Sequence, residues 1–196
     1  QLLPVPDGTQ LPTQLDTGST AKFPFQAKRL VGWDTTVVEL GQLEVVGGTP
    51  DEWLSRVKAD VVIACFGYNE SFAGKEGVDK FKQDLDALVK HTLSQNYSGK
   101  GAPRLVLVSP VPHEKLPDPN LPDPAANNAR LEMYTAAMAD VAKANGVPLV
   151  DLFHGLLGFG NSGPLTTNGI HLNSQGNLAA AATIELTLFG ALKDRE

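Results

Sequence analysis

Two apolar stretches decide the fold of this chain: Ala59–Phe66 (ADVVIACF) and Arg104–Ser109 (RLVLVS). Each is a short continuous apolar run, which is typical of a strand buried on both faces of a parallel sheet. Between them, apolar residues recur at helical spacing from Val78 to Leu93, with Lys and Asp among them. A strand, a helix and a second strand in this order predict a parallel β–α–β unit.

The alternation continues toward the end of the chain. The spacing of Leu131, Tyr134, Met138 and Val141 predicts a further amphipathic helix, and VPLVDL at 147–152 predicts a third strand. Residues 153–172 are expected to form a long Gly-rich loop before an Ala-rich helix over about 174–192. The pattern therefore predicts an α/β fold, with helices on both faces of a parallel sheet.

The first part of the chain is different in character. Residues 1–28 contain four prolines, and we expect them to form an extended arm, followed by one domain over 29–196. Short β-like runs at 36–40 and 43–46 precede a helix start at Thr49, where a capping residue is followed by proline and two acids.

Composition excludes several classes of function. The chain has 196 residues and a net charge of -6, which argues against binding nucleic acid or an anionic membrane surface. No apolar run reaches the roughly 18 residues of a membrane span. A single cysteine, Cys65, excludes an internal disulfide or a zinc site of several thiolates, and the four histidines lack metal-ligand spacing. We expect no metal and no cofactor.

The chain begins at Gln1 without methionine, so we expect a processed form or a fragment.

Ligands bind outside the carboxyl ends of the strands in such sheets. That rule selects the segments 67–72, 110–114 and 153–172. In the first, Gly67 permits a sharp turn, after which the Asn69 amide could donate to a developing oxyanion; the alternative is that both residues merely form a turn. Gly67, Tyr68 and Glu70 are candidate substrate contacts.

Two histidines belong to the other two segments. His113 and Glu114 follow the second strand, where they could contact substrate or assist a base, and His113 is a further candidate substrate contact; the alternative is a surface position on a loop with six prolines. His171 follows the long loop and directly precedes the last helix. It is a candidate general base, and the alternative is a solvated loop histidine.

Together these blocks resemble the SGNH (GDSL-like) hydrolase superfamily. The stretches DVVIACFGYNESFAG, RLVLVSPVPHE, NNARLEMY and PLTTNGIHLN are similar to a branch found in planctomycete and related bacterial proteins. The resemblance implies a flavodoxin-like, three-layer α/β/α fold and metal-free hydrolysis of small-molecule or glycan acyl esters. It also favours an exported bacterial protein. By this resemblance Asn69 matches the oxyanion asparagine, Gly67 the glycine that opens its block, and His171 the catalytic base.

The chain departs from the family pattern at two places. The family usually has aspartate three residues before the histidine, where this chain has Asn168. A neutral amide orients an imidazole but does not stabilise the imidazolium, and the analogous exchange in a serine protease costs roughly 10⁴ in turnover. In addition, the Gly-Asp-Ser block of the nucleophile is not recognisable. The nearest string is Asp16–Ser19, which makes Ser19 the candidate nucleophile; the alternative is a turn residue in the arm.

A backbone N–H from a second family block is expected to complete the oxyanion hole. Gly32 in RLVGWDT is the candidate, and Gly41 is the alternative. The sequence thus favours an ester hydrolase with Ser/His chemistry. A non-catalytic binding module of the same fold, part of a larger assembly with a protein partner, remains the alternative. A third possibility is an enzyme fragment without its first strand and serine.

Overall fold

The computed structural model describes residues 49–159 and 163–190. The chain divides into two units, one of residues 1–59 with 97–100 and the other of residues 60–96 with 101–196. The predicted arm at 1–28 and the predicted strands at 36–40 and 43–46 lie outside the described residues.

The described part of the first unit is built around one helix, α2 (Pro50–Arg56). The Thr49 side chain accepts a hydrogen bond from the Glu52 backbone N–H at 3.4 Å, and Glu52 Oε2 accepts one from the Thr49 N–H at 2.8 Å. This reciprocal capping box satisfies two backbone donors that a helix start leaves without partners. The predicted helix start at Thr49 is confirmed.

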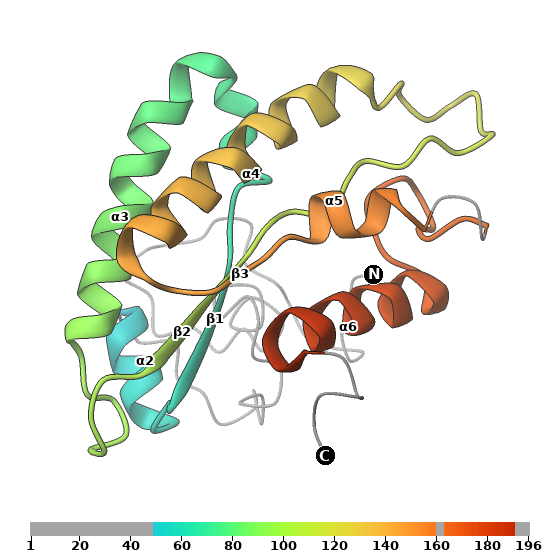
Figure 1. The fold of residues 1–196 in the computed structure, drawn as a ribbon. Coiled ribbons are helices and arrows are strands. Elements are labelled where there is room, and N and C mark those ends of the chain that lie inside the picture. Colours follow the sequence, from blue (N-terminus) through green and yellow to red (C-terminus); the bar gives the residue numbers. More distant parts are fainter. Residues whose placement is uncertain (1–48, 160–162, 191–196) are drawn as a thin grey trace, which may run out of the picture. The chain divides into compact units, whose positions relative to one another are not determined.

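A parallel sheet forms the centre of the second unit (Figure 1). Its described strands are β1 (Val61–Cys65), β2 (Arg104–Val108) and β3 (Leu149–Val150), in the order β1-β2-β3. Ile63 lies opposite Val106, and Val108 lies opposite Val150. The three predicted strands are therefore present, although the third is only two residues long.

Helices lie on both sides of this sheet. On one side α3 (Val78–Ser94) packs against α4 (Ala125–Asn145), and on the other side lies α6 (Ser174–Phe189), next to α5 (Leu152–Leu157) (Figure 1). Side chains of β2 contribute to the helix–sheet interfaces on both sides of the sheet, because successive side chains of a strand point to opposite faces. Val106 and Val108 belong to an apolar cluster with Ala179 and Ala180 of α6. The predicted α/β/α arrangement is confirmed.

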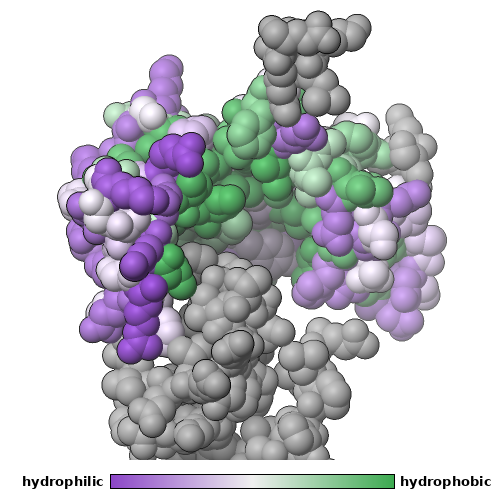
Figure 2. All heavy atoms as spheres, turned by 90° about the horizontal axis from the view of Figure 1, so that it is seen from below, coloured by the Kyte–Doolittle hydropathy of each residue, from purple (hydrophilic) through white to green (hydrophobic). Residues whose placement is uncertain are grey.

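The two faces of β1 are covered unequally. Val62 and Ala64 are buried, whereas Val61 and Ile63 on the opposite face are 42% and 50% exposed. Figure 2 shows the molecule from below, where apolar residues gather in a band between two flanks rich in polar residues. The α6 side of the sheet thus keeps uncovered apolar area at β1 among the described residues.

The prediction of an unbroken loop over 153–172 is wrong in its first part, because Leu152–Leu157 forms the helix α5. The Asp151 side chain caps this helix by accepting from the His154 backbone N–H at 2.9 Å. Leu152, Phe153 and Leu156 are buried and anchor the helix in the core. Six residues with a central glycine give too short a pattern for the 3.6-residue period to be recognised.

Among the described residues, none of the helices has the length and apolar character needed to cross a membrane. The same residues contain no group of three or more His, Cys, Asp or Glu side chains that could hold a metal ion.

Candidate active site

The end of β1 packs directly against the segment that follows β2. Gly67 has a φ of +100°, which residues other than glycine rarely adopt. A Cβ atom there would lie 3.2 Å from Pro110 Cδ and 3.3 Å from Met138 Sδ. Gly67 is thus required by both its backbone conformation and this close approach, and the turn places the next residues at the carboxyl edge of the sheet.

Asn69 lies in this turn and begins the 3₁₀ helix η1 (Glu70–Ala73), which η2 (Lys75–Gly77) follows. Its side chain is exposed and makes no capping hydrogen bond. The amide is therefore free of local backbone bonds and available to a ligand. This position fits the predicted oxyanion donor, and the role itself stays a prediction.

The neighbours of Asn69 hold the turn. Glu70 Oε2 accepts from the Gly67 backbone N–H at 2.8 Å, and the Ser71 hydroxyl donates to the Tyr68 carbonyl at 2.6 Å. Glu70 is therefore engaged with the backbone of its own turn. Its predicted contact with substrate, like that of Gly67 and Tyr68, stays a prediction.

Two aromatic residues, Tyr68 and Phe72, lie on either side of Asn69 in the sequence. The two rings meet edge to face with centroids 5.8 Å apart, and Phe72 is 62% exposed. Arg130 of α4 places its guanidinium 5.8 Å from the Phe72 centroid and donates to Asn127 Oδ1 at 3.2 Å. The Phe72 ring is therefore an exposed apolar surface with a cation near its face.

His171 is presented by a tight turn over residues 166–172. Thr166 and Leu172 form an antiparallel bridge, and the Thr167 N–H donates to the His171 carbonyl at 2.8 Å. Inside the turn, Asn168 Oδ1 accepts from the His171 backbone N–H at 3.0 Å and from the Ile170 N–H at 3.3 Å. These two donors fix the amide with its oxygen facing the turn.

The same oxygen of Asn168 lies 3.0 Å from His171 Nδ1. Because a carbonyl oxygen only accepts, Nδ1 must carry the proton, which leaves Nε2 of the neutral ring with its lone pair. No described residue is a hydrogen-bond partner of Nε2. This is the tautomer that a general base requires.

None of the described serines is hydrogen-bonded to His171. Buried Ser71 donates to the Tyr68 carbonyl, and buried Ser109 accepts from the Phe153 N–H at 3.0 Å. The candidate nucleophile Ser19, and both candidates for the second oxyanion donor, Gly32 and Gly41, lie outside the described residues.

His113, predicted to contact substrate, is only 8% exposed. Its backbone N–H donates to Asn128 Oδ1 at 2.7 Å, and the Asn128 amide donates back to its carbonyl at 2.8 Å. Its ring Nδ1 lies 3.3 Å from Asn127 Nδ2. The first turn of α4 therefore clamps His113, and substrate contact stays a prediction. Sequence reasoning missed this clamp, for which the adjacent asparagines at 127 and 128 were the available signal.

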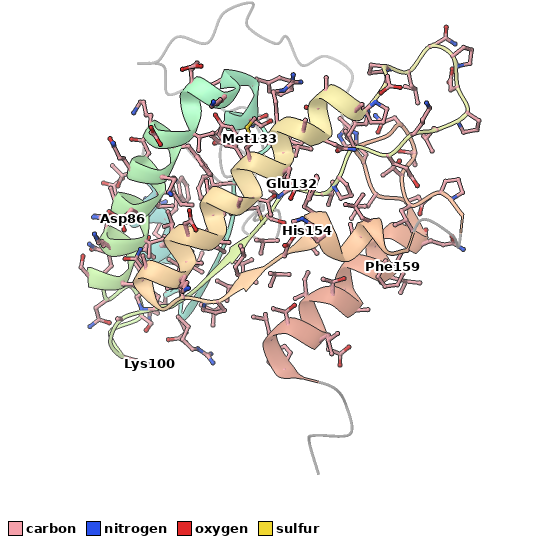
Figure 3. The ribbon with its side chains drawn as sticks, turned by 45° about the horizontal axis from the view of Figure 1, so that its top comes forward. Asp86, Lys100, Glu132, Met133, His154 and Phe159 are labelled. Atoms are coloured by element: carbon pink, nitrogen blue, oxygen red, sulfur yellow. The ribbon has the colours of Figure 1, made fainter. Side chains whose placement is uncertain are left out.

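Another histidine, His154, lies near the end of β3 between two carboxylates, an arrangement that was not predicted from the sequence. His154 Nδ1 lies 2.6 Å from Asp151 Oδ2, and Nε2 lies 3.0 Å from Glu132 Oε1 of α4. Figure 3 shows His154 and Glu132 facing each other across the two helices. The hydrogen bond to Asp151, followed by the contribution of Glu132, raises the pKa of His154 above its ordinary value although partial burial acts against them.

These elements form an α/β/α domain in which the turn with Asn69 follows β1, and the segment after β2 contacts the turn with His171 through the Glu114 N–H, which donates to the Gly169 carbonyl. The chain belongs to the GDSL-like lipase/acylhydrolase family, whose family model matches residues 7–179. A search of curated protein sequences found no match.

Several solved structures share the fold. An alpha/beta hydrolase enzyme from the metagenome of Lake Arreo, Spain, is 23% identical with a TM-score of 0.51, over 71% of this chain and 67% of that chain. A catalytic mutant of an acetylxylan esterase from Geobacillus stearothermophilus is 16% identical with a TM-score of 0.53, over 69% of this chain and 62% of that chain. The acetyl xylan esterase AlAXEase is 20% identical with a TM-score of 0.51, over 82% and 89% respectively. At these identities the likeness is one of fold.

Proposed function

We propose that this chain is an SGNH-type ester hydrolase in which His171 is the general base and Asn69 an oxyanion donor. The observation that carries the proposal is the His171 ring itself. Asn168 holds Nδ1 at 3.0 Å and leaves Nε2 without a partner among the described residues. A side chain kept in this tautomer at the edge where ligands bind is suited to accept a proton from a nucleophile.

In this mechanism a serine oxygen attacks the acyl carbonyl, and its proton passes to His171 Nε2. The carbonyl oxygen becomes an oxyanion, which the Asn69 amide and a backbone N–H of Gly32 stabilise by hydrogen bonds. His171 then gives the proton to the departing alcohol, which leaves the acyl group on the serine. Water attacks this acyl-enzyme by the same steps, which releases the acid and restores the serine. Ser19 is the candidate nucleophile.

We infer that the substrate is a small-molecule or glycan acyl ester. The exposed ring of Phe72, with Tyr68 at its edge and Arg130 over it, offers an apolar face beside polar donors next to Asn69. Such a surface suits a sugar, which has both an apolar face and hydroxyl groups. Two structures of similar fold are acetylxylan esterases, which supports the carbohydrate class.

The experiment is hydrolysis of short-chain acyl esters and of acetylated xylooligosaccharides by the full chain and by Asn69→Ala. Loss of one oxyanion donor is expected to lower kcat by about 10²–10³-fold. Asn177→Ala, at an exposed position of α6, is the matched control and should keep the wild-type rate. Hydrolysis by the wild type that Asn69→Ala leaves unchanged would contradict the assignment.

A second candidate function is a non-catalytic module that binds the same class of ligand. One observation favours it: Asn168 is neutral at the position where the resemblance implies an aspartate. Calorimetry with acetylated xylooligosaccharides separates the two functions. Binding without turnover supports the module, whereas turnover that depends on Asn69 rejects it.

A further inference from the structure

The turn that carries Asn168 and His171 is attached to a carboxylate from a distant loop. We propose that Glu114, in the segment after β2, is a positioning residue that holds this turn in its catalytic geometry. The inference rests on the proposed function for its kinetic consequence. Its structural content, the control of the His171 ring by Glu114, can be tested separately.

The Glu114 carboxylate receives three donors from two consecutive residues. The Leu165 N–H donates to Oε1 at 2.9 Å, and the Thr166 N–H donates to Oε2 at 2.8 Å. The Thr166 hydroxyl also donates to Oε2. No described cation forms an ion pair with Glu114, so backbone and hydroxyl donors satisfy its charge. Hydrogen bonds to an ionised acceptor are roughly twice as strong as neutral ones.

Thr166 transmits this attachment to the residue beside Asn168. While its hydroxyl donates to Glu114, its oxygen accepts from the Gly169 N–H at 3.0 Å. The Gly169 carbonyl in turn accepts from the Glu114 backbone N–H at 2.8 Å. Gly169 is therefore held on both sides of its backbone by the Glu114–Thr166 pair.

Close packing removes the remaining freedom of this residue. Gly169 has a φ of +91°, and a Cβ atom there would lie 2.8 Å from His113 Nε2 and 3.1 Å from the Glu114 carbonyl oxygen. His113 is itself fixed by Asn128. The glycine between Asn168 and His171 is thus seated against a rigid support, which the two successive residues after Pro112 provide.

This arrangement gives Glu114 a role through other residues rather than at the substrate, because its carboxylate is occupied by Leu165 and Thr166. If the attachment is lost, the turn loosens, Asn168 Oδ1 no longer stays on His171 Nδ1, and both ring tautomers become populated. A misplacement of about 1 Å can cost roughly 10² in rate. The effect should fall on kcat rather than on KM.

The test uses Glu114→Gln, which keeps the shape but faces the donors with an amide that can accept at only one oxygen. Glu76→Gln, at an exposed position in η2, is the matched control. We expect kcat to fall about 10–100-fold with KM within about twofold, and the control to be unchanged. Nitrogen NMR of His171 should show mainly protonated Nδ1 in the wild type and in Glu76→Gln, and a mixture of tautomers in Glu114→Gln.

Two Thr166 variants keep the test valid if Glu114→Gln does not fold. Thr166→Val removes the hydroxyl at constant shape and should reproduce the tautomer mixture and the fall in kcat, whereas Thr166→Ser should restore both. Wild-type kcat together with a wild-type tautomer in both Glu114→Gln and Thr166→Val would overturn the inference. If the wild type hydrolyses no ester, the proposed function fails, and the NMR measurement still decides whether Glu114 controls the ring.

Discussion

Two histidines of this protein have the same local arrangement and opposite environments. His171 and His154 each place Nδ1 against a side-chain oxygen of the residue three positions earlier, at 3.0 Å from Asn168 and at 2.6 Å from Asp151. The side chain that contacts His171 Nδ1 is a neutral amide, and His171 Nε2 has no partner among the described residues. The partner of His154 is a carboxylate, and its Nε2 faces a second carboxylate, Glu132, at 3.0 Å.

The difference shows that the spacing of a histidine and its orienting residue does not define a catalytic pair. A base needs a free nitrogen with a lone pair, which the His171 arrangement provides. Two carboxylates stabilise the charged form of His154, raise its pKa and occupy both of its nitrogens. We therefore interpret His154 as an electrostatic link between α4 and α5, whereas the arrangement of His171 fits the proposed general base.

The largest effect is expected when the two residues are exchanged for glutamine in turn. His171→Gln removes the proposed base and should lower the rate of ester hydrolysis by at least about 10³-fold. His154→Gln, the matched variant, should stay within about twofold of the wild type. Steady-state rates on one short-chain ester measure both. Similar losses in both variants would show that the two histidines do not differ in function.

A smaller effect is expected when the residue that contacts Nδ1 of each histidine is replaced by the type that contacts the other histidine. Asn168→Asp gives His171 a charged partner that stabilises the imidazolium formed in the reaction, so kcat should rise roughly tenfold or more. Asp151→Asn keeps an oxygen to cap α5 and should leave kcat unchanged. A fall in kcat for Asn168→Asp would mean that the turn, with its two backbone donors to Asn168, does not accept a carboxylate.

The smallest effect concerns the stability of the fold. The pKa of His154 is raised in the folded protein, so its contribution is fully present below the ordinary histidine value of about 6.5 and is lost as pH rises through the folded pKa. The His154 side chain is half exposed, which limits the contribution to less than about 1 kcal/mol. Denaturant unfolding of the wild type and His154→Gln at pH 5.5 and pH 9 should show the larger difference at pH 5.5. A larger difference at pH 9 would contradict the sign.

The strands and long helices could be predicted because their apolar periodicity is strong. ADVVIACF and RLVLVS became β1 and β2, and the helical spacing from Val78 onward became α3. The helix α5 could not be predicted, since its stability comes from the Asp151 cap and from burial of Leu152 and Phe153 against distant residues. Such tertiary contacts leave no period in a six-residue segment.

The rule that ligands bind at the carboxyl ends of strands predicts the segments that carry Asn69 and His171, and the roles of these two residues stay predictions. The contacts between distant segments could not be predicted in this way. The role of Glu114 depends on contacts across about 50 residues, with separations of 51 to Leu165 and 52 to Thr166. A carboxylate in a proline-rich loop has no sequence pattern that distinguishes a backbone anchor from a substrate contact.

The most direct measurement of the central claim, that His171 activates a serine, is covalent labelling with a fluorophosphonate. In this reaction the serine oxygen forms a bond to phosphorus, fluoride leaves, and the serine proton passes to His171 Nε2. Mass spectrometry of the full chain after digestion identifies the labelled residue. We predict one labelled serine in the wild type, with Ser19 the candidate, and no label at that serine in His171→Gln. An unlabelled wild type, or equal labelling in both proteins, would contradict the account.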